Sequence, residues 1–246
     1  MKRLKFAILI LCLALVPFLQ SCLDNDSNVS SLAIATIKVI EGQNYYFAID
    51  GGEKMLPGDT TNIRNYKVKN GQRAFVYFNL LDDKVQGYDY NAKIEYIENI
   101  LTKGIIPMTA ATADSIGDDR ITAAEIWIAG GYLNIEFQIL GTSYPKKLHM
   151  VNLVQNQIGD ENTEEGYISL EFRHNAYGDS PDRLGVGLVS FKLESLTLSA
   201  EKGLKIRVNT IYDGVKYYKI DFPTDATNLK VARQPKTSNL FNERIY

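Results

Sequence analysis

Hydrophobic and polar residues alternate along much of the chain after residue 30. The alternation is regular in five segments, which are residues 88–96, 133–139, 168–173, 189–194 and 204–208. Successive side chains of a β-strand point to opposite faces of the sheet, so a period of two indicates strands with one buried face. In the first segment this places Tyr88, Tyr90, Ala92, Ile94 and Tyr96 on one face. No helical stripe is found after residue 30, and the pattern predicts an all-β fold.

Turn-forming residues separate the expected strands. Asp213-Gly214 divides two of them and is typical of a type I′ hairpin turn, in which both central residues have positive φ. Gly51-Gly52 ends an aromatic strand, and Asn70-Gly71 precedes the next one. Between these two turns, Glu53–Lys69 contains Pro57-Gly58-Asp59 and is expected to be a long polar loop.

The expected strands fall into two groups. Residues 32–106 hold strands near 32–40, 44–50, 72–81 and 88–97 with a short fifth near 99–105, which fits a small OB-like β-barrel. Residues 107–232 hold six or seven strands, which fits an antiparallel β-sandwich. Residues 233–246 show no alternation and are expected to form a C-terminal tail. Periodicity alone does not distinguish a barrel from a sandwich in either group.

The first residues of the chain follow a different pattern. Lys2, Arg3 and Lys5 precede an apolar run, Phe6 to Phe18, that is shorter than the ~20 residues of a membrane-spanning helix. Residues 1–21 are therefore expected to be a signal peptide. The following Leu19-Gln20-Ser21-Cys22 resembles the bacterial lipobox, in which the peptide is cut before a cysteine that carries diacylglycerol and further acyl chains such as palmitate. Cys22 is the predicted lipidation site, and an ordinary secretory cleavage site or an uncleaved anchor are the alternatives.

Residues 22–31 are polar and are expected to form a flexible tether between the lipid and the folded part. A lipid-anchored chain of this type is expected in the outer membrane, facing either the periplasm or the cell surface. Leu23-Asp24-Asn25-Asp26 is similar to the acid-rich tethers that send some lipoproteins to the surface, and it is equally well explained as a solvated linker.

Cysteine usage argues against thiol or disulfide chemistry, and net charge argues against nucleic-acid binding. Cys12 leaves with the signal peptide and Cys22 is used by the lipid, so the mature chain is expected to contain neither a thiol nor a disulfide. Cleavage also removes three cations and lowers Lys+Arg from 27 to 24 against 29 acids, which gives a net charge of −5. Nucleic acid is not an expected partner, because no basic stripe is present to neutralise phosphates.

The residues that carry chemistry in enzymes are not arranged as a catalytic or metal site. His149 and His174 are the two histidines, and we expect each to lie in a strand and to bond to backbone rather than bind a metal. Neither a strained Gly-x-Ser-x-Gly turn nor a phosphate-binding helix after Gly185-Val186-Gly187 is present. Asp82-Asp83, Asp118-Asp119 and Glu164-Glu165 are expected to be solvated loop charges, although paired carboxylates of a glycosidase stay an alternative. We expect no enzymatic activity, no metal and no cofactor.

Tyrosine is abundant, with 15 residues that include the adjacent pairs Tyr45-Tyr46 and Tyr217-Tyr218. Neighbours on a strand face opposite ways, so one ring of each pair is expected on each face. An exposed ring on a barrel face would be able to stack on a sugar or on a partner side chain. The alternative, which we favour, is that these rings cover the core and a sheet edge.

Several segments resemble those of the NigD-like lipoproteins of Gram-negative anaerobes. They are Tyr46-Phe47, Asp50-Gly51, 71–76, 100–103, 131–135, 147–154, 170–176 and 189–191, and the resemblance covers roughly residues 31 to 230. It implies an N-terminal OB-like domain and a C-terminal β-sandwich, with no catalytic residues to carry over. The family takes its name from a bacteriocin locus. We therefore expect a non-enzymatic binding or protective role for a lipid-anchored envelope protein, with a glycan-binding accessory lipoprotein of a surface uptake system as the alternative and with the ligand or protein partner unknown.

Overall fold

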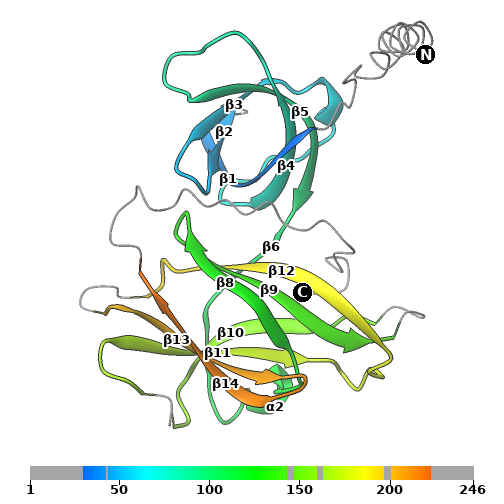
Figure 1. Cartoon of the computed structure of the whole chain (residues 1–246), viewed down its shortest axis with the longest axis vertical. Helices are drawn as coiled ribbons and strands as arrows, with labels where there is room; N and C mark the ends of the chain where they lie inside the picture. Colours follow the sequence, from blue (N-terminus) through cyan, green and yellow to red (C-terminus); the bar gives the residue numbers. More distant parts are fainter. Residues whose placement is uncertain (1–29, 43, 143–146, 160–162, 197–200, 223–246) are drawn as a thin grey trace, which may run out of the picture. The chain divides into compact units, whose positions relative to one another are not determined.

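The computed structural model describes residues 30–42, 44–142, 147–159, 163–196 and 201–222 (Figure 1). The signal peptide, Cys22, most of the tether and the C-terminal tail lie outside these residues, so the structure adds nothing to those predictions. Within the described residues the fold is all-β, as predicted, and its strands form one closed barrel and two further sheets.

The five N-terminal strands close into a barrel in the order β1-β2-β3-β5-β4 (Figure 1). They are β1 (Ser31–Glu41), β2 (Asn44–Ile49), β3 (Lys54–Asp59), β4 (Arg73–Leu80) and β5 (Tyr90–Asn99). The interior is filled by side chains that alternate along these strands, among them Ile37, Phe47, Met55, Val76 and Ile94, each 0% exposed. Full burial of such a side chain contributes ~1.5–3 kcal/mol, so hydrophobic packing holds the barrel closed. A small five-stranded barrel of this kind is an OB-fold, as predicted.

Two details of the barrel differ from the expectation. β3 lies inside the segment that we expected to be a polar loop, and only the short 3-10 helix η2 (Thr61–Ile63) and its flanks are irregular there. The register between β4 and β5 shifts at one point: Tyr77 of β4 pairs with Tyr96 of β5, and the next residue, Phe78, pairs with Ile94. The skipped residue marks a β-bulge in β5. The bulge turns Tyr96 outward, where it is 57% exposed, and turns Ile97 into the core. The prediction that Tyr96 shares the buried face of Ile94 was therefore wrong.

The C-terminal strands form two sheets. One has the order β14-β13-β11-β10-β7 and the other the order β6-β12-β9-β8 (Figure 1). Their bounds are β6 (Leu101–Gly104), β7 (Ile106–Met108), β8 (Thr122–Ala129), β9 (Tyr132–Gly141), β10 (Met150–Asn156), β11 (Tyr167–Asn175), β12 (Arg183–Lys192), β13 (Gly203–Thr210) and β14 (Gly214–Asp221), with one short helix, α2 (Ala113–Ile116). Buried residues of both sheets, including Phe137, Phe172 and Phe191, share one hydrophobic core. This is the predicted β-sandwich, although it is not purely antiparallel as we expected, because β6–β12, β7–β10 and β11–β13 pair in parallel.

The sandwich uses residues that we had placed in the barrel. β6 pairs with β12 in parallel, and β7 pairs with β10 in parallel, so residues 101–106 contribute to the C-terminal sheets. The short fifth strand expected near 99–105 is thus a sandwich strand, and β3 supplies the fifth strand of the barrel. Parallel pairing needs partners that are distant along the chain, and alternation within one segment carries no information about that partner.

The β13–β14 hairpin has a different turn from the one expected. Thr210 pairs with Gly214, so Ile211–Asp213 form a three-residue loop. Gly214 has a φ of 69°, whereas Asp213 is not among the described non-glycine residues with positive φ. The turn is therefore of the three-residue type with glycine in the left-handed region, and not type I′.

A buried polar cluster joins the barrel to the C-terminal sheets. Arg73 of β4 is 0% exposed, and its guanidinium donates to both carboxylate oxygens of Asp50. The remaining N–H groups reach Thr36 at 3.2 Å, Asn134 at 2.9 Å and Ser190 at 3.4 Å, so all five donors have an acceptor. Asn134 and Ser190 belong to β9 and β12. The fully paired guanidinium therefore stabilises the junction in which it is buried.

Candidate functional site

The β10–β11 hairpin opens at one end and leaves a hollow. The ladder between the two strands ends at the pair Val154–Glu171, although β10 continues to Asn156 and β11 starts at Tyr167. Beyond that pair the strands separate, and a cavity of about 610 Å³ opens between them. It is lined by Gln155, Asn156, Thr163, Glu164, Glu165, Tyr167, Ile168, Ser169 and Glu201.

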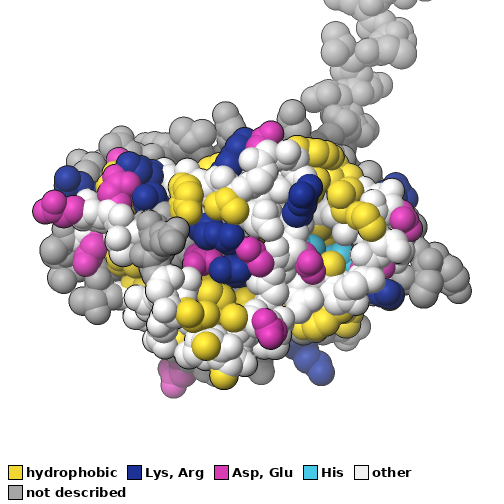
Figure 2. Space-filling model, turned by 90° about the horizontal axis from the view of Figure 1, so that it is seen from below, with side chains coloured by type: hydrophobic (Ala, Val, Ile, Leu, Met, Phe, Trp, Pro, Cys, Tyr) yellow, Lys and Arg dark blue, Asp and Glu magenta, His cyan; other side chains and the backbone are white. Residues whose placement is uncertain are grey.

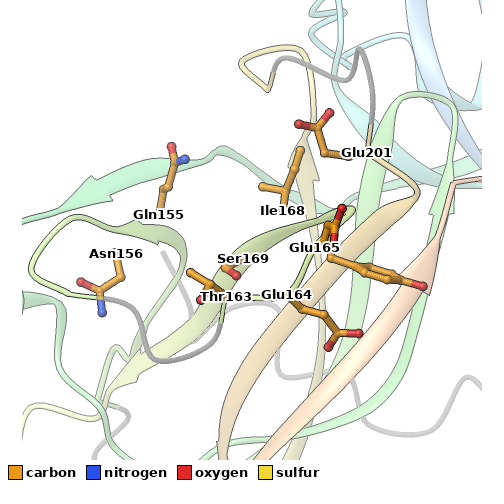
Figure 3. Close-up of a pocket in the computed structure, with 9 residues that line it drawn as sticks. Gln155, Asn156, Thr163, Glu164, Glu165, Ile168, Ser169 and Glu201 are labelled. Atoms are coloured by element: carbon orange, nitrogen blue, oxygen red, sulfur yellow. The ribbon is translucent and has the colours of Figure 1, made fainter.

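Hydrogen-bonding side chains dominate the lining of this hollow. Figure 3 shows the amides of Gln155 and Asn156 on one side and the carboxylates of Glu164, Glu165 and Glu201 on the other. The hydroxyls of Thr163 and Ser169 lie between these two groups. A lining of amides, hydroxyls and carboxylates suits a ligand that both donates and accepts hydrogen bonds.

Two lysines neutralise part of the acidic side of the hollow. Glu164 lies 3.2 Å from the Lys205 amine and also contacts Lys219. The hydrogen bond from Lys219, followed by that from Lys205, lowers the pKa of Glu164. Tyr167 donates to Asp221 at 2.7 Å, and this bond raises the pKa of the phenol. At this side of the hollow, Glu164 is therefore paired with two lysines and Tyr167 is held by Asp221.

The outer face of the same sheet carries a second group of paired charges. Asp118 accepts from Arg207 at 2.9 and 2.8 Å and lies 3.0 Å from Arg173, and both arginines also contact the buried carboxylate of Glu171. The hydrogen bonds to Asp118 raise the pKa of Arg207. Figure 2 shows one face of the molecule, on which dark blue basic and magenta acidic side chains adjoin each other between hydrophobic patches. Asp118 and Glu164 are thus paired, and not the solvated loop charges that we expected.

The tyrosine pairs divide between the two faces of their strands, as the alternation requires. Tyr45 packs against the barrel core, whereas Tyr46 contacts the ring of Tyr88 outside it. Tyr218 packs against the sandwich core and Tyr217 is 49% exposed. Lysine amines lie over the outer rings, 5.8 Å from the Tyr46 centre and 5.3 Å from that of Tyr217. Both of these outward-facing rings, Tyr46 and Tyr217, therefore have a cationic neighbour on one face.

The two histidines lie together at the other end of the β10–β11 hairpin. His174 is 1% exposed and its Nδ1 lies 3.1 Å from the Arg120 carbonyl, which is the backbone contact that we expected. His149 instead lies between His174 and Asp179, at 2.9 and 3.0 Å. Among the described residues no group of three His, Cys, Asp or Glu side chains is arranged to hold a metal ion. The register of β10 and β11 brings the histidines together, and neither motif nor spacing in the sequence indicates it.

Two protein-family models together match most of the chain. Residues 34–100 match the NigD-like N-terminal OB domain, and residues 104–222 match the NigD-like C-terminal β-sandwich domain. The chain belongs to the NigD-like family. No match is found among curated proteins.

Solved structures of similar proteins share this NigD-like architecture. One, described as a putative toxin-related protein from Parabacteroides distasonis, is 34% identical with a TM-score of 0.67 and covers 81% of this chain and 96% of its own. A NigD-like immunity protein from Bacteroides caccae is 18% identical, with a TM-score of 0.61 and coverage of 80% and 98%. A putative lipoprotein from Bacteroides fragilis is 10% identical, with a TM-score of 0.57 and coverage of 79% and 98%. The last two show the fold alone.

Proposed function

We propose that this NigD-like protein is a lipid-anchored protein of the outer membrane that binds or shields a partner without catalysing a reaction, in an immunity-type role. The observation that carries the proposal is the position of Cys22, directly after Leu19-Gln20-Ser21 and separated by eight residues from Ser31, where β1 begins. One relative is described as a putative lipoprotein and another as an immunity protein, which supports both parts of the proposal.

The physical basis of the anchor is the transfer of acyl chains into the bilayer. Each buried methylene contributes ~0.8 kcal/mol, and two or more chains hold a protein on the membrane far longer than one. Among the described residues no helix is long and apolar enough to cross a membrane. The short polar tether would let the barrel and the sandwich reach a partner close to the membrane surface, on the periplasmic or the outer side.

Replacement of Cys22 tests the anchor. The Cys22→Ser protein should not incorporate labelled palmitate, and it should keep residues 1–21, because the cut is made before a cysteine that carries lipid. Cys12→Ser is the matched control, because it makes the same substitution in the expected signal peptide and should leave both the palmitate label and the cut in place. Incorporation of labelled palmitate by Cys22→Ser to the same extent as by the unmodified chain would overturn the proposal.

The hollow between β10 and β11 favours a second candidate function, which is the binding of a glycan in a surface uptake system. Its amides, hydroxyls and carboxylates, together with the Tyr167 ring, are the groups that bind sugars in protein sites. A glycan array probed with the Cys22→Ser chain tests this idea. Binding should be lost in Gln155→Ala, which lines the hollow, and kept in Gln157→Ala, two residues further on and outside it. An array without hits would rule this candidate out.

A further inference from the structure

The two buried histidines lie in a row of hydrogen bonds with one further group at each end, the Asp179 carboxylate and the Arg120 carbonyl. His149 Nε2 lies 3.0 Å from Asp179, His149 Nδ1 lies 2.9 Å from His174 Nε2, and His174 Nδ1 lies 3.1 Å from the Arg120 carbonyl oxygen. The side chains of His149 and Asp179 are 2% and 1% exposed, so water does not replace these contacts. Each contact needs one proton to be a hydrogen bond.

Counting these protons shows that two neutral rings are not sufficient. The Arg120 carbonyl only accepts, so His174 must carry a proton on Nδ1. A carboxylate also only accepts, so His149 must carry one on Nε2, and the contact between the rings needs a third. Two neutral imidazoles carry two protons in total. The row is therefore complete only when one proton more is bound.

The surroundings decide which group holds the additional proton. Asp179 already accepts from the backbone N–H and the hydroxyl of Thr142, each at 2.8 Å, and from the backbone N–H of Ser180 at 3.0 Å. Burial by itself would raise the pKa of Asp179, but the bonds from Thr142 and from His149 outweigh it and hold the pKa below its usual value. Asp179 is thus an anion, and the proton belongs to the ring beside it, His149. Burial and the charge on His149 lower the pKa of His174 to about 4, which keeps that ring neutral.

Other charges near the pair agree with this assignment. Lys147 lies on the far side of Asp179, with its amine 3.8 Å from the carboxylate and 48% of its side chain exposed. Asp119 faces the His174 side and accepts the Ala176 N–H at 2.7 Å. Arg120 points its guanidinium to the Ile211 carbonyl at 3.1 Å and presents only its backbone oxygen to His174. Gly141 leaves the space for the row, since a Cβ there would lie 2.9 Å from Asp179 and 3.0 Å from His149.

We infer that His149 and His174 hold three ring N–H protons in the folded protein and, as an imidazolium–imidazole pair against Asp179, form an acid-sensitive clamp. The clamp joins the end of β9, at Thr142, to β10, to β11 and to the segment that contains Asp179. A fourth ring proton would enter at His174 Nε2 and point at the N–H of His149. The two rings then repel each other, and the Asp179 segment is released from the strands.

Nitrogen-15 NMR of the two rings tests this directly, because the chain contains two histidines and an untagged sample gives signals from this pair alone. At pH 7 the complete mature chain should show one ring protonated on both nitrogens and one protonated on Nδ1 alone. A His149→Gln variant assigns the first ring to His149. Two singly protonated rings, or two doubly protonated rings, at pH 7 would overturn the inference.

Two aspartate variants separate the clamp from general effects of charge. Asp179→Asn should remove the additional proton, so that His149 becomes singly protonated at pH 7. Asp182→Asn is the matched control, because Asp182 is an exposed acid three residues further on. It should leave all three ring protons in place. A doubly protonated His149 in both variants would contradict the role assigned to Asp179.

Discussion

Asp50 binds both terminal nitrogens of Arg73 inside the protein, where the arginine has no exposed surface and the carboxylate very little. Their side chains come from the turn after β2 and from the first residue of β4, and the pair lies against Asn134 and Ser190 of the sandwich. Such a pair costs desolvation when it forms, so its net contribution is small while it is intact. Removal of one partner destabilises the folded protein, because the other charge is then buried without a counter-charge.

Asp50→Asn should therefore destabilise the protein strongly. Loss of one partner of a buried ion pair costs ~3–5 kcal/mol, which chemical denaturation followed by tyrosine fluorescence measures as a lower unfolding midpoint. Glu194→Gln is the matched control, since it removes the carboxylate of an exposed pair with Lys192 at 3.6 Å. The control should change the free energy of unfolding by less than ~1 kcal/mol. Equal effects of the two substitutions would contradict the role given to Arg73.

Gly187 has no side chain because the ring of Phe137 occupies that place. The two residues are paired across β12 and β9, and a Cβ on Gly187 would lie 2.5 Å from the ring. Gly187→Ala should cost ~1–3 kcal/mol, because the core around Phe172 and Phe191 is closely packed and cannot shift freely. Gly104→Ala, in a strand position with no atom within 4 Å of the added Cβ, should change stability by less than ~1 kcal/mol. Thermal unfolding of both variants gives the comparison, and a neutral Gly187→Ala would show that the core is looser than described.

The histidine pair predicts a loss of stability in acid. The pKa of His174 is lowered to about 4 in the folded protein from an ordinary value near 6.5. Between these pH values the unfolded chain binds a proton that the folded chain does not, so stability falls as the pH falls through this window. The total effect is about 3 kcal/mol. His174→Gln should be less stable at pH 7 and should lose this dependence, as unfolding midpoints at pH 7, 6, 5 and 4 would show. The same pH dependence in His174→Gln would rule out His174 as its source.

Much of the architecture is contained in the alternation of the sequence. In the segment 133–139 the hydrophobic positions, such as Leu133 and Ile135, are fully buried, and the same holds for Leu170 and Phe172. Alternation fails at bulges, because one additional residue exchanges the two faces of a strand. This happens in β5 before Tyr96 and in β8, where the register shifts between Ala123 and Glu125 and hides the strand from a search for period two.

Other features depend on the fold as a whole. Pro57 and Gly58 are poor strand residues, and β3 forms because it is held between β2 and β5 in the barrel. His149 and His174 are 25 residues apart, and only the register that pairs Val151 with His174 places them in contact. The hollow likewise follows from the point at which the β10–β11 ladder ends, and no property of a single segment predicts that point.

The exposed position of Tyr96 gives a simple check of the bulge. With 57% of Tyr96 exposed and Ile97 6% exposed, Tyr96→Ser should change stability by less than ~1 kcal/mol, whereas Ile97→Ala should cost ~2–4 kcal/mol. Strict alternation predicts the reverse order. Urea unfolding of the two variants distinguishes the registers, and a larger loss for Tyr96→Ser would contradict the bulge.

The mass of the protein isolated from its own membranes tests the central proposal most directly. We expect a chain that begins at Cys22 and is heavier than its amino acids by a diacylglycerol group and one further acyl chain, with the excess confined to the N-terminal peptide. A chain that begins at Cys22 or elsewhere and has the mass of its amino acids alone would contradict the lipid anchor, and with it the proposed place of this protein in the cell envelope.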